Sequence, residues 1–102
     1  MGDLKYVMFN DGNRNIPVIF ADTIAHISMA ELVTNHKDCK SFRVVSAGFI
    51  HMNDTVCYGD SSTLNIQSRQ EDSEIIQFYP YDHGLGNTEM IDLIKSMLRK
   101  LK

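Results

Sequence analysis

The sequence has few of the residues that would assign it to a class at once. It contains two cysteines, two prolines and no tryptophan among 102 residues. Cys39 and Cys57 are too few for a disulfide framework, so we expect both to be thiols that pack inside the fold. No apolar run approaches the roughly 18 residues of a membrane span, and the opening MGDLKYVMFN lacks the segments of a signal peptide. A cytoplasmic protein without membrane contacts is predicted.

A basic surface is also missing from most of the chain. The formal net charge is −3, and residues 1–79 contain ten acidic against six basic side chains. The cations within residues 95–102 are expected at a helix C-terminus in any case, because they complement the helix dipole. Since duplex binding normally needs a clustered basic face, direct nucleic-acid binding is not expected. The length and the 43% apolar content fit one compact globular domain.

Two apolar runs near the start predict a pair of strands. Residues 4–9 and 16–20 are rich in β-branched and aromatic side chains, and the turn-forming run NDGNRN separates them. Pro17 cannot donate a hydrogen bond to a neighbouring strand. The second strand should therefore begin at this proline or lie at a sheet edge.

A longer run, residues 42–52, is apolar on both faces and predicts a central strand. Gly48 in its middle is typical of a bulge or of a close approach by another backbone. After residue 52, alternating apolar side chains and turn-forming residues indicate further short strands. The sheet is predicted to be an antiparallel β-meander of three to five strands, with turns at 53–54 and 59–61 and strands at 55–58 and 63–67.

Short helices are predicted against one face of this sheet, which makes the fold class α+β. Two capping-box patterns mark where these helices should begin. The first helix should end in the polar run 35–40, and the second should cover about 69–79 before Pro80 stops it. The two capping pairs are Ser28 with Glu31, and Ser68 with Glu71.

The most regular pattern lies at the end of the chain. A glycine-containing linker follows Pro80, and an amphipathic helix is predicted from Thr88 onward. We therefore divide the chain into an α+β domain, 1–79, and a linker with a helix, 80–102, which belongs to the same domain or mediates dimerisation. The helix should pack on one face of the domain or bind a partner or a second copy. Its apolar stripe consists of Met90, Ile91, Ile94, Met97, Leu98 and Leu101.

The linker is also a candidate anion site. Glycines followed by the first amides of a helix can bind phosphate or carboxylate. The spacing matches neither a P-loop nor a dinucleotide motif, so a simple glycine connector is the favoured interpretation. The candidate residues are His83, Gly84, Gly86, Asn87 and Thr88.

Metal binding and catalysis have weaker support. His36 with Cys39, and His51 with Cys57, are the candidate metal pairs, but zinc needs four preorganised ligands and no CxxC or HxxxH pair occurs. No GxSxG motif is present either. We predict no metal, no cofactor and no catalytic residue, and keep a small enzyme of unknown class as a reserve hypothesis.

Four segments resemble small uncharacterised proteins encoded by bacteriophages and prophages. They read KYVMF, IPVIFADTIAHISMAEL, VVSAGF and CYGDSSTLNIQSRQEDSEII, and the resemblance covers about residues 4–76. It implies a short α+β domain in the cytoplasm of a bacterial host, without known catalytic residues. It also implies an accessory protein that acts on host machinery.

Two function hypotheses follow. The first is a non-enzymatic inhibitor that binds a host protein, plausibly a defence component, through an exposed sheet face or the final helix. Its acidic character would suit a basic partner. The second is an oligomeric protein that sequesters a nucleotide signal in pockets between subunits. The inhibitor is the preferred hypothesis.

Overall fold

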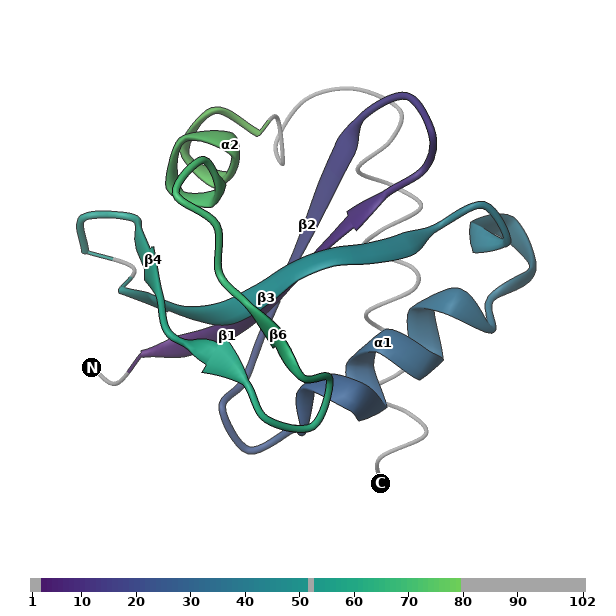
Figure 1. Ribbon diagram of the computed structural model, residues 1–102, viewed down its shortest axis with the longest axis horizontal. Helices are drawn as coiled ribbons and strands as arrows, with labels where there is room; N and C mark the ends of the chain where they lie inside the picture. Colours follow the sequence, from purple (N-terminus) through teal and green to yellow (C-terminus); the bar gives the residue numbers. More distant parts are fainter. Residues whose placement is uncertain (1–2, 52, 80–102) are drawn as a thin grey trace.

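The computed structural model describes residues 3–51 and 53–79 and shows an α+β fold (Figure 1). Four antiparallel strands form the main sheet in the order β2-β1-β3-β4, and β5 and β6 form a separate two-stranded ribbon. No helix in these residues is long and apolar enough to cross a membrane. The elements are β1 (Leu4–Asn10), β2 (Asn15–Phe20), α1 (His26–Thr34), the 3₁₀ helix η1 (Lys37–Cys39), β3 (Arg43–His51), β4 (Val56–Tyr58), β5 (Asp60–Ser61), β6 (Ile66–Gln67) and α2 (Asp72–Phe78).

The turn between β1 and β2 is built by the polar run that the sequence marked. The Asp11 carboxylate accepts hydrogen bonds from the amides of Asn13 and Arg14, both at 2.9 Å. Gly12 has a φ of +102°, which glycine adopts at little cost. Pro17 lies in β2, an edge strand, as the sequence predicted.

The predicted meander is wrong at the connection between β2 and β3, although four antiparallel strands are present. β1 lies between β2 and β3, so the chain leaves β2, passes through α1 and returns to the other edge of β1. The residues of β1 and β2 explain this order. Residues 6–9 of β1 are fully buried, which requires cover on both faces, whereas Pro17 keeps β2 at the edge.

β3 is central, as predicted, and Gly48 marks a crossing of two backbones. β3 pairs with β1 on one side and with β4 on the other. A Cβ added at Gly48 would lie 2.5 Å from the carbonyl oxygen of Tyr58 and 3.2 Å from the Ser68 Cβ. The chain that leaves β4 can therefore pass over β3 only at a glycine.

The helices lie on opposite faces of the sheet, so the prediction of helices on one face is wrong. One core includes Val7, Phe9 and Val33 and packs β1 and β2 against α1. The other includes Tyr6, Met8 and Ile76 and packs the opposite side of β1 against α2. Alternation along β1 makes both cores possible, because consecutive side chains point to opposite faces.

The second core contains a buried ionic network. The Tyr6 hydroxyl donates to Asp72 Oδ2 at 2.6 Å, and the Arg69 amide donates to the same oxygen at 2.9 Å. Arg69 Nε contacts Asp72 Oδ1 at 3.1 Å and Ser46 Oγ at 3.2 Å. Burial, followed by the hydrogen bond to Asp72, raises the pKa of Tyr6. The network joins the start of the chain to α2.

Both predicted capping boxes are wrong. The N-cap of α1 is Ala25, and Ser28 lies inside the helix. The N-cap of α2 is Glu71, while the Ser68 hydroxyl donates to the Gly59 carbonyl at 2.8 Å. Tertiary contacts, which a local pattern does not contain, determine where these helices begin.

The strands after β3 are also shorter than predicted. The predicted strand 63–67 is reduced to β6, because residues 62–65 form the turn that joins β5 to β6. The predicted turn at 59–61 contains β5 instead. Asn65 has a φ of +54°, which fits its place in this turn.

Candidate functional site

The two site hypotheses drawn from the end of the chain lie outside the described residues. They concern the anion site at His83, Gly84, Gly86, Asn87 and Thr88, and the partner-binding stripe of Met90, Ile91, Ile94, Met97, Leu98 and Leu101. Both stay predictions, as does the division of the chain at residue 80.

The cysteine and histidine pairs do not converge on a site. Cys57 is opposite Ile50 in the sheet, so it points to the face opposite that of His51. Burial raises the pKa of the Cys57 thiol, which disfavours a reactive thiolate. His36 Nδ1 accepts the Asp38 amide and caps η1. In residues 3–51 and 53–79, no three His, Cys, Asp or Glu side chains form a metal-binding group.

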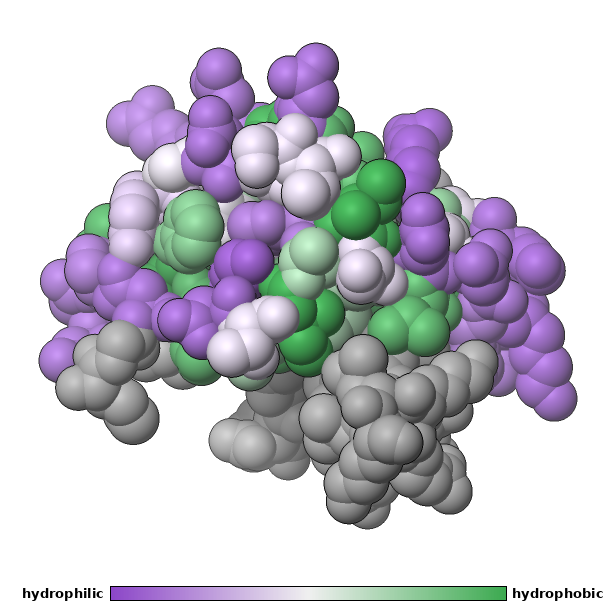
Figure 2. Space-filling view, turned by 90° about the horizontal axis from the view of Figure 1, so that it is seen from below, coloured by the Kyte–Doolittle hydropathy of each residue, from purple (hydrophilic) through white to green (hydrophobic). Residues whose placement is uncertain are grey.

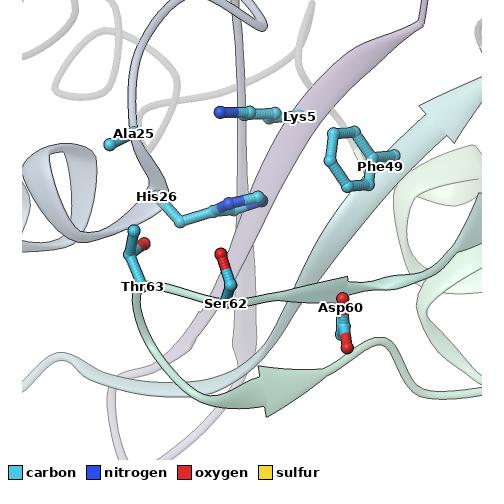
Figure 3. Close-up of a pocket in the computed structure, with 7 residues that line it drawn as sticks. All are labelled: Lys5, Ala25, His26, Phe49, Asp60, Ser62 and Thr63. Atoms are coloured by element: carbon cyan, nitrogen blue, oxygen red, sulfur yellow. The ribbon is translucent and has the colours of Figure 1, made fainter.

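A pocket of about 180 Å³ lies where the start of α1 meets the β5–β6 turn (Figure 3). Four separate parts of the chain form it: β1, the start of α1, β3, and the segment from β5 into the turn that follows. It is therefore a product of the tertiary fold. Its lining residues are Lys5, Ala25, His26, Phe49, Asp60, Ser62 and Thr63.

His26 is the most constrained side chain of the pocket. It is the first residue of α1 and only 4% exposed. Its Nε2 lies 2.8 Å from the carbonyl oxygen of Gly48. Because a carbonyl only accepts, Nε2 holds the proton and the neutral ring keeps an acceptor at Nδ1. Burial lowers the pKa of His26 and so favours this neutral form.

The stability of the fold is expected to decrease as the pH falls below about 6.5, the ordinary pKa of histidine. The pKa of His26 is lower in the folded state, so the unfolded state binds more protons in this range. This part of the stability is fully present above pH 6.5. Urea unfolding at several pH values would measure it.

The variant His26→Gln supplies the comparison. Its side-chain amide can still donate to the Gly48 carbonyl, but it does not titrate. We expect a flatter stability profile between pH 5 and pH 7 for this variant. Profiles of the same slope would show that His26 does not contribute to the pH dependence.

Two further polar side chains of the pocket, Lys5 and Thr63, are positioned by hydrogen bonds to the backbone around α1. Lys5 Nζ donates to the carbonyl of Ile24 at 2.9 Å, which leaves its other two N–H groups as further donors. Thr63 Oγ1 accepts the amide of Ile27, in the first turn of α1, at 3.2 Å. These bonds hold β1 and the β5–β6 turn against the start of the helix.

A continuous row of aromatic rings runs through the pocket to the surface. The His26 ring meets Phe20 and Phe49 edge-on, with centroids 5.7 and 5.6 Å apart. Phe49 stacks on Tyr58 at 5.8 Å, and Tyr58 stacks on His51 at 4.9 Å. The row therefore connects a buried phenylalanine with exposed rings on β3 and β4.

The Asp3 carboxylate orders the exposed end of this row. His51 Nδ1 lies 2.5 Å from Asp3 Oδ1, and the Tyr58 hydroxyl donates to the other carboxylate oxygen. That hydrogen bond raises the pKa of Tyr58. The two exposed rings are thereby held in one orientation, which lowers the entropy that a binding partner would have to remove.

Sequence reasoning missed the pocket, because its residues are scattered along the chain. The run IAHI places His26 among apolar residues and was the available indication of a buried histidine. Nothing local indicates that Lys5 and Asp60 lie beside it.

No family model, curated protein or solved structure matches the chain. The resemblance to phage-encoded proteins therefore stays a prediction. The geometry of the site is therefore the basis for the function proposed below.

Proposed function

We propose that the protein binds a host protein and inhibits it, without catalysing a reaction. The observation that supports binding is a set of exposed apolar and aromatic side chains around the pocket, here called the aromatic surface: Ile27, His51, Val56 and Tyr58. Val56 and Tyr58 are 42% and 38% exposed. The resemblance to phage-encoded proteins supports a bacterial host protein as the partner, plausibly a defence component.

The aromatic surface has the composition of a protein interface. Val56 is opposite His51, and Tyr58 is opposite Phe49, so His51, Val56 and Tyr58 share one face of the sheet with Phe49. Tyrosine is enriched among the side chains that dominate binding energy. Figure 2, a space-filling view of one face of the molecule, shows hydrophobic side chains, in green, among hydrophilic ones, in purple.

The size of the pocket favours a single side chain as its occupant. Pockets for drug-sized ligands and cofactors usually measure about 300–1,000 Å³, and this one measures about 180 Å³. The pocket would not enclose a whole nucleotide. Sequestration of a nucleotide would need the pockets between subunits that the second hypothesis assumes.

The pocket also fits binding better than catalysis. It contains Asp60, His26 and Ser62, the residue types of a hydrolytic triad. In a triad, however, a carboxylate orients the imidazole, whereas here the Gly48 carbonyl accepts from Nε2. A carbonyl oxygen has no negative charge, so it stabilises the charged ring less than the carboxylate of a triad does. This arrangement supports a recognition site.

Replacing Tyr58 with alanine is expected to weaken partner binding at least about tenfold, because truncation of a central interface aromatic commonly costs 2 kcal/mol or more. The partner would first be identified by affinity purification from a bacterial lysate. Its affinity for wild-type and variant protein would then be measured with purified components by calorimetry.

Phe78→Ala is the matched control. Phe78 is 72% exposed, but it lies at the end of α2, which packs on the opposite face of the sheet. We expect this variant to keep the wild-type affinity. Equal affinities for wild type and Tyr58→Ala, or recovery of the bait alone, would contradict the proposal.

A further inference from the structure

The pocket places opposite charges on either side of a neutral acceptor. In Figure 3 the Lys5 amine lies above the His26 ring and the Asp60 carboxylate lies below it. The two charges also act on the imidazole in opposite directions, since Lys5 lowers and Asp60 raises its pKa. A group bound in the pocket therefore faces a positively charged hydrogen-bond donor, Lys5, on one side and a negatively charged acceptor, Asp60, on the other.

These groups require an occupant that both accepts and donates hydrogen bonds. Lys5 only donates, whereas Asp60 and the Nδ1 atom of neutral His26 only accept. The hydroxyls of Ser62 and Thr63 can do either. A carboxylate would satisfy Lys5 but would face Asp60, and an ammonium group would satisfy Asp60 but would face Lys5.

We infer that the pocket binds a carboxamide, the side chain of a glutamine or asparagine of the partner protein. This inference rests on the proposed function, because it assigns the carboxamide to the partner. The amide oxygen accepts from Lys5, the two N–H groups donate toward Asp60 and His26, and the aliphatic stem contacts Phe49 and Ala25. The group has no net charge, so neither Lys5 nor Asp60 repels it.

Propionamide and propionate, which have nearly the same shape, test this assignment directly. Each would be titrated into ¹⁵N-labelled protein and followed by chemical-shift changes of the Ala25, His26, Ser62 and Thr63 amides. We expect saturable shifts with propionamide, and binding of propionate at least about fivefold weaker because it faces Asp60. Glycine, whose opposite charges could pair with Lys5 and Asp60, serves as a third probe. It should bind more weakly than propionamide, because both of its charges would lose their hydration and it has no aliphatic stem to contact Phe49 and Ala25.

The variant Asp60→Asn makes the test more specific. It removes the negative charge but keeps an acceptor oxygen, so propionate should bind at least about fivefold better while propionamide stays within about threefold. Asp38→Asn, which changes an exposed acid in η1, is the matched control and should alter neither affinity. Lys5→Met should weaken propionamide binding without unfolding the protein, which circular dichroism would check.

Three results would overturn the inference: no saturable shifts with propionamide, tighter binding of propionate or glycine to the wild type, or shifts confined to other residues. The titration uses only the protein and the probes. The titration can therefore fail while the Tyr58→Ala experiment succeeds, which would overturn the carboxamide site alone. If the titration succeeds and the Tyr58→Ala experiment fails, the carboxamide site stands and the proposed partner binding does not.

Discussion

Replacing Asp72 with alanine is expected to lower the free energy of unfolding by about 3–5 kcal/mol, the usual cost of removing one member of a buried ion pair. Asp72 is fully buried and accepts from the Tyr6 hydroxyl, the Arg69 amide and Arg69 Nε. Alanine would leave all three donors without this acceptor. Small domains are stable by only about 5–15 kcal/mol, so the loss would be a large share of the total. Urea unfolding at neutral pH would measure it.

Glu71→Ala is the matched control for this experiment. Glu71 is the neighbouring acid and contacts the same guanidinium at 3.6 Å, but its side chain is 61% exposed. Exposed pairs contribute about 0–1 kcal/mol. If Asp72→Ala is tolerated as well as Glu71→Ala, the buried network does not stabilise the fold. Asp72→Asn, with the same shape, should fall between the two.

Gly48→Ala is expected to cost about 2–3 kcal/mol, in the range for overpacking a tight site. Its Cβ would lie 2.5 Å from the Tyr58 carbonyl oxygen, a backbone atom that cannot move without displacing β4. The same displacement would change the contact between the Gly48 carbonyl and His26. The variant should therefore lose stability and also change the amide shifts around the pocket.

The comparison for this variant is Gly12→Ala. Nothing lies within 4 Å of a Cβ at Gly12, so its cost comes only from the φ of +102° and should be about 1 kcal/mol. The pocket is remote from this turn, so the chemical shifts of the amides around it should not change. A Gly48→Ala protein as stable as Gly12→Ala would show that β4 can adjust to the added methyl group.

The sequence predicted those features of the fold that depend on a residue's own chemistry. Pro17 lacks the amide proton of an internal strand and lies at an edge, and Gly48 lies where another backbone approaches. Both constraints hold whatever surrounds the residue. The α+β class and the antiparallel pairing follow from alternation in the same way.

Features that depend on distant partners were not predictable. The capping box at Ser28 failed because α1 begins earlier, at His26, whose imidazole bonds to Gly48 in β3. The box at Ser68 failed because its hydroxyl bonds to Gly59. The pocket has the same origin, since Lys5, His26 and Asp60 become neighbours only after β1 has been placed beside β3.

The position of β1 in the middle of the sheet also has a consequence for synthesis. β1 can pair with β2 through a local turn soon after both leave the ribosome, but its other edge must wait for β3, which begins only at Arg43. Until then the nascent chain presents an unpaired edge of its most apolar strand, with which a strand of another chain can pair. Closure of the segment between β2 and β3 is therefore expected to set the folding rate, and lengthening that segment should slow folding more than it lowers stability.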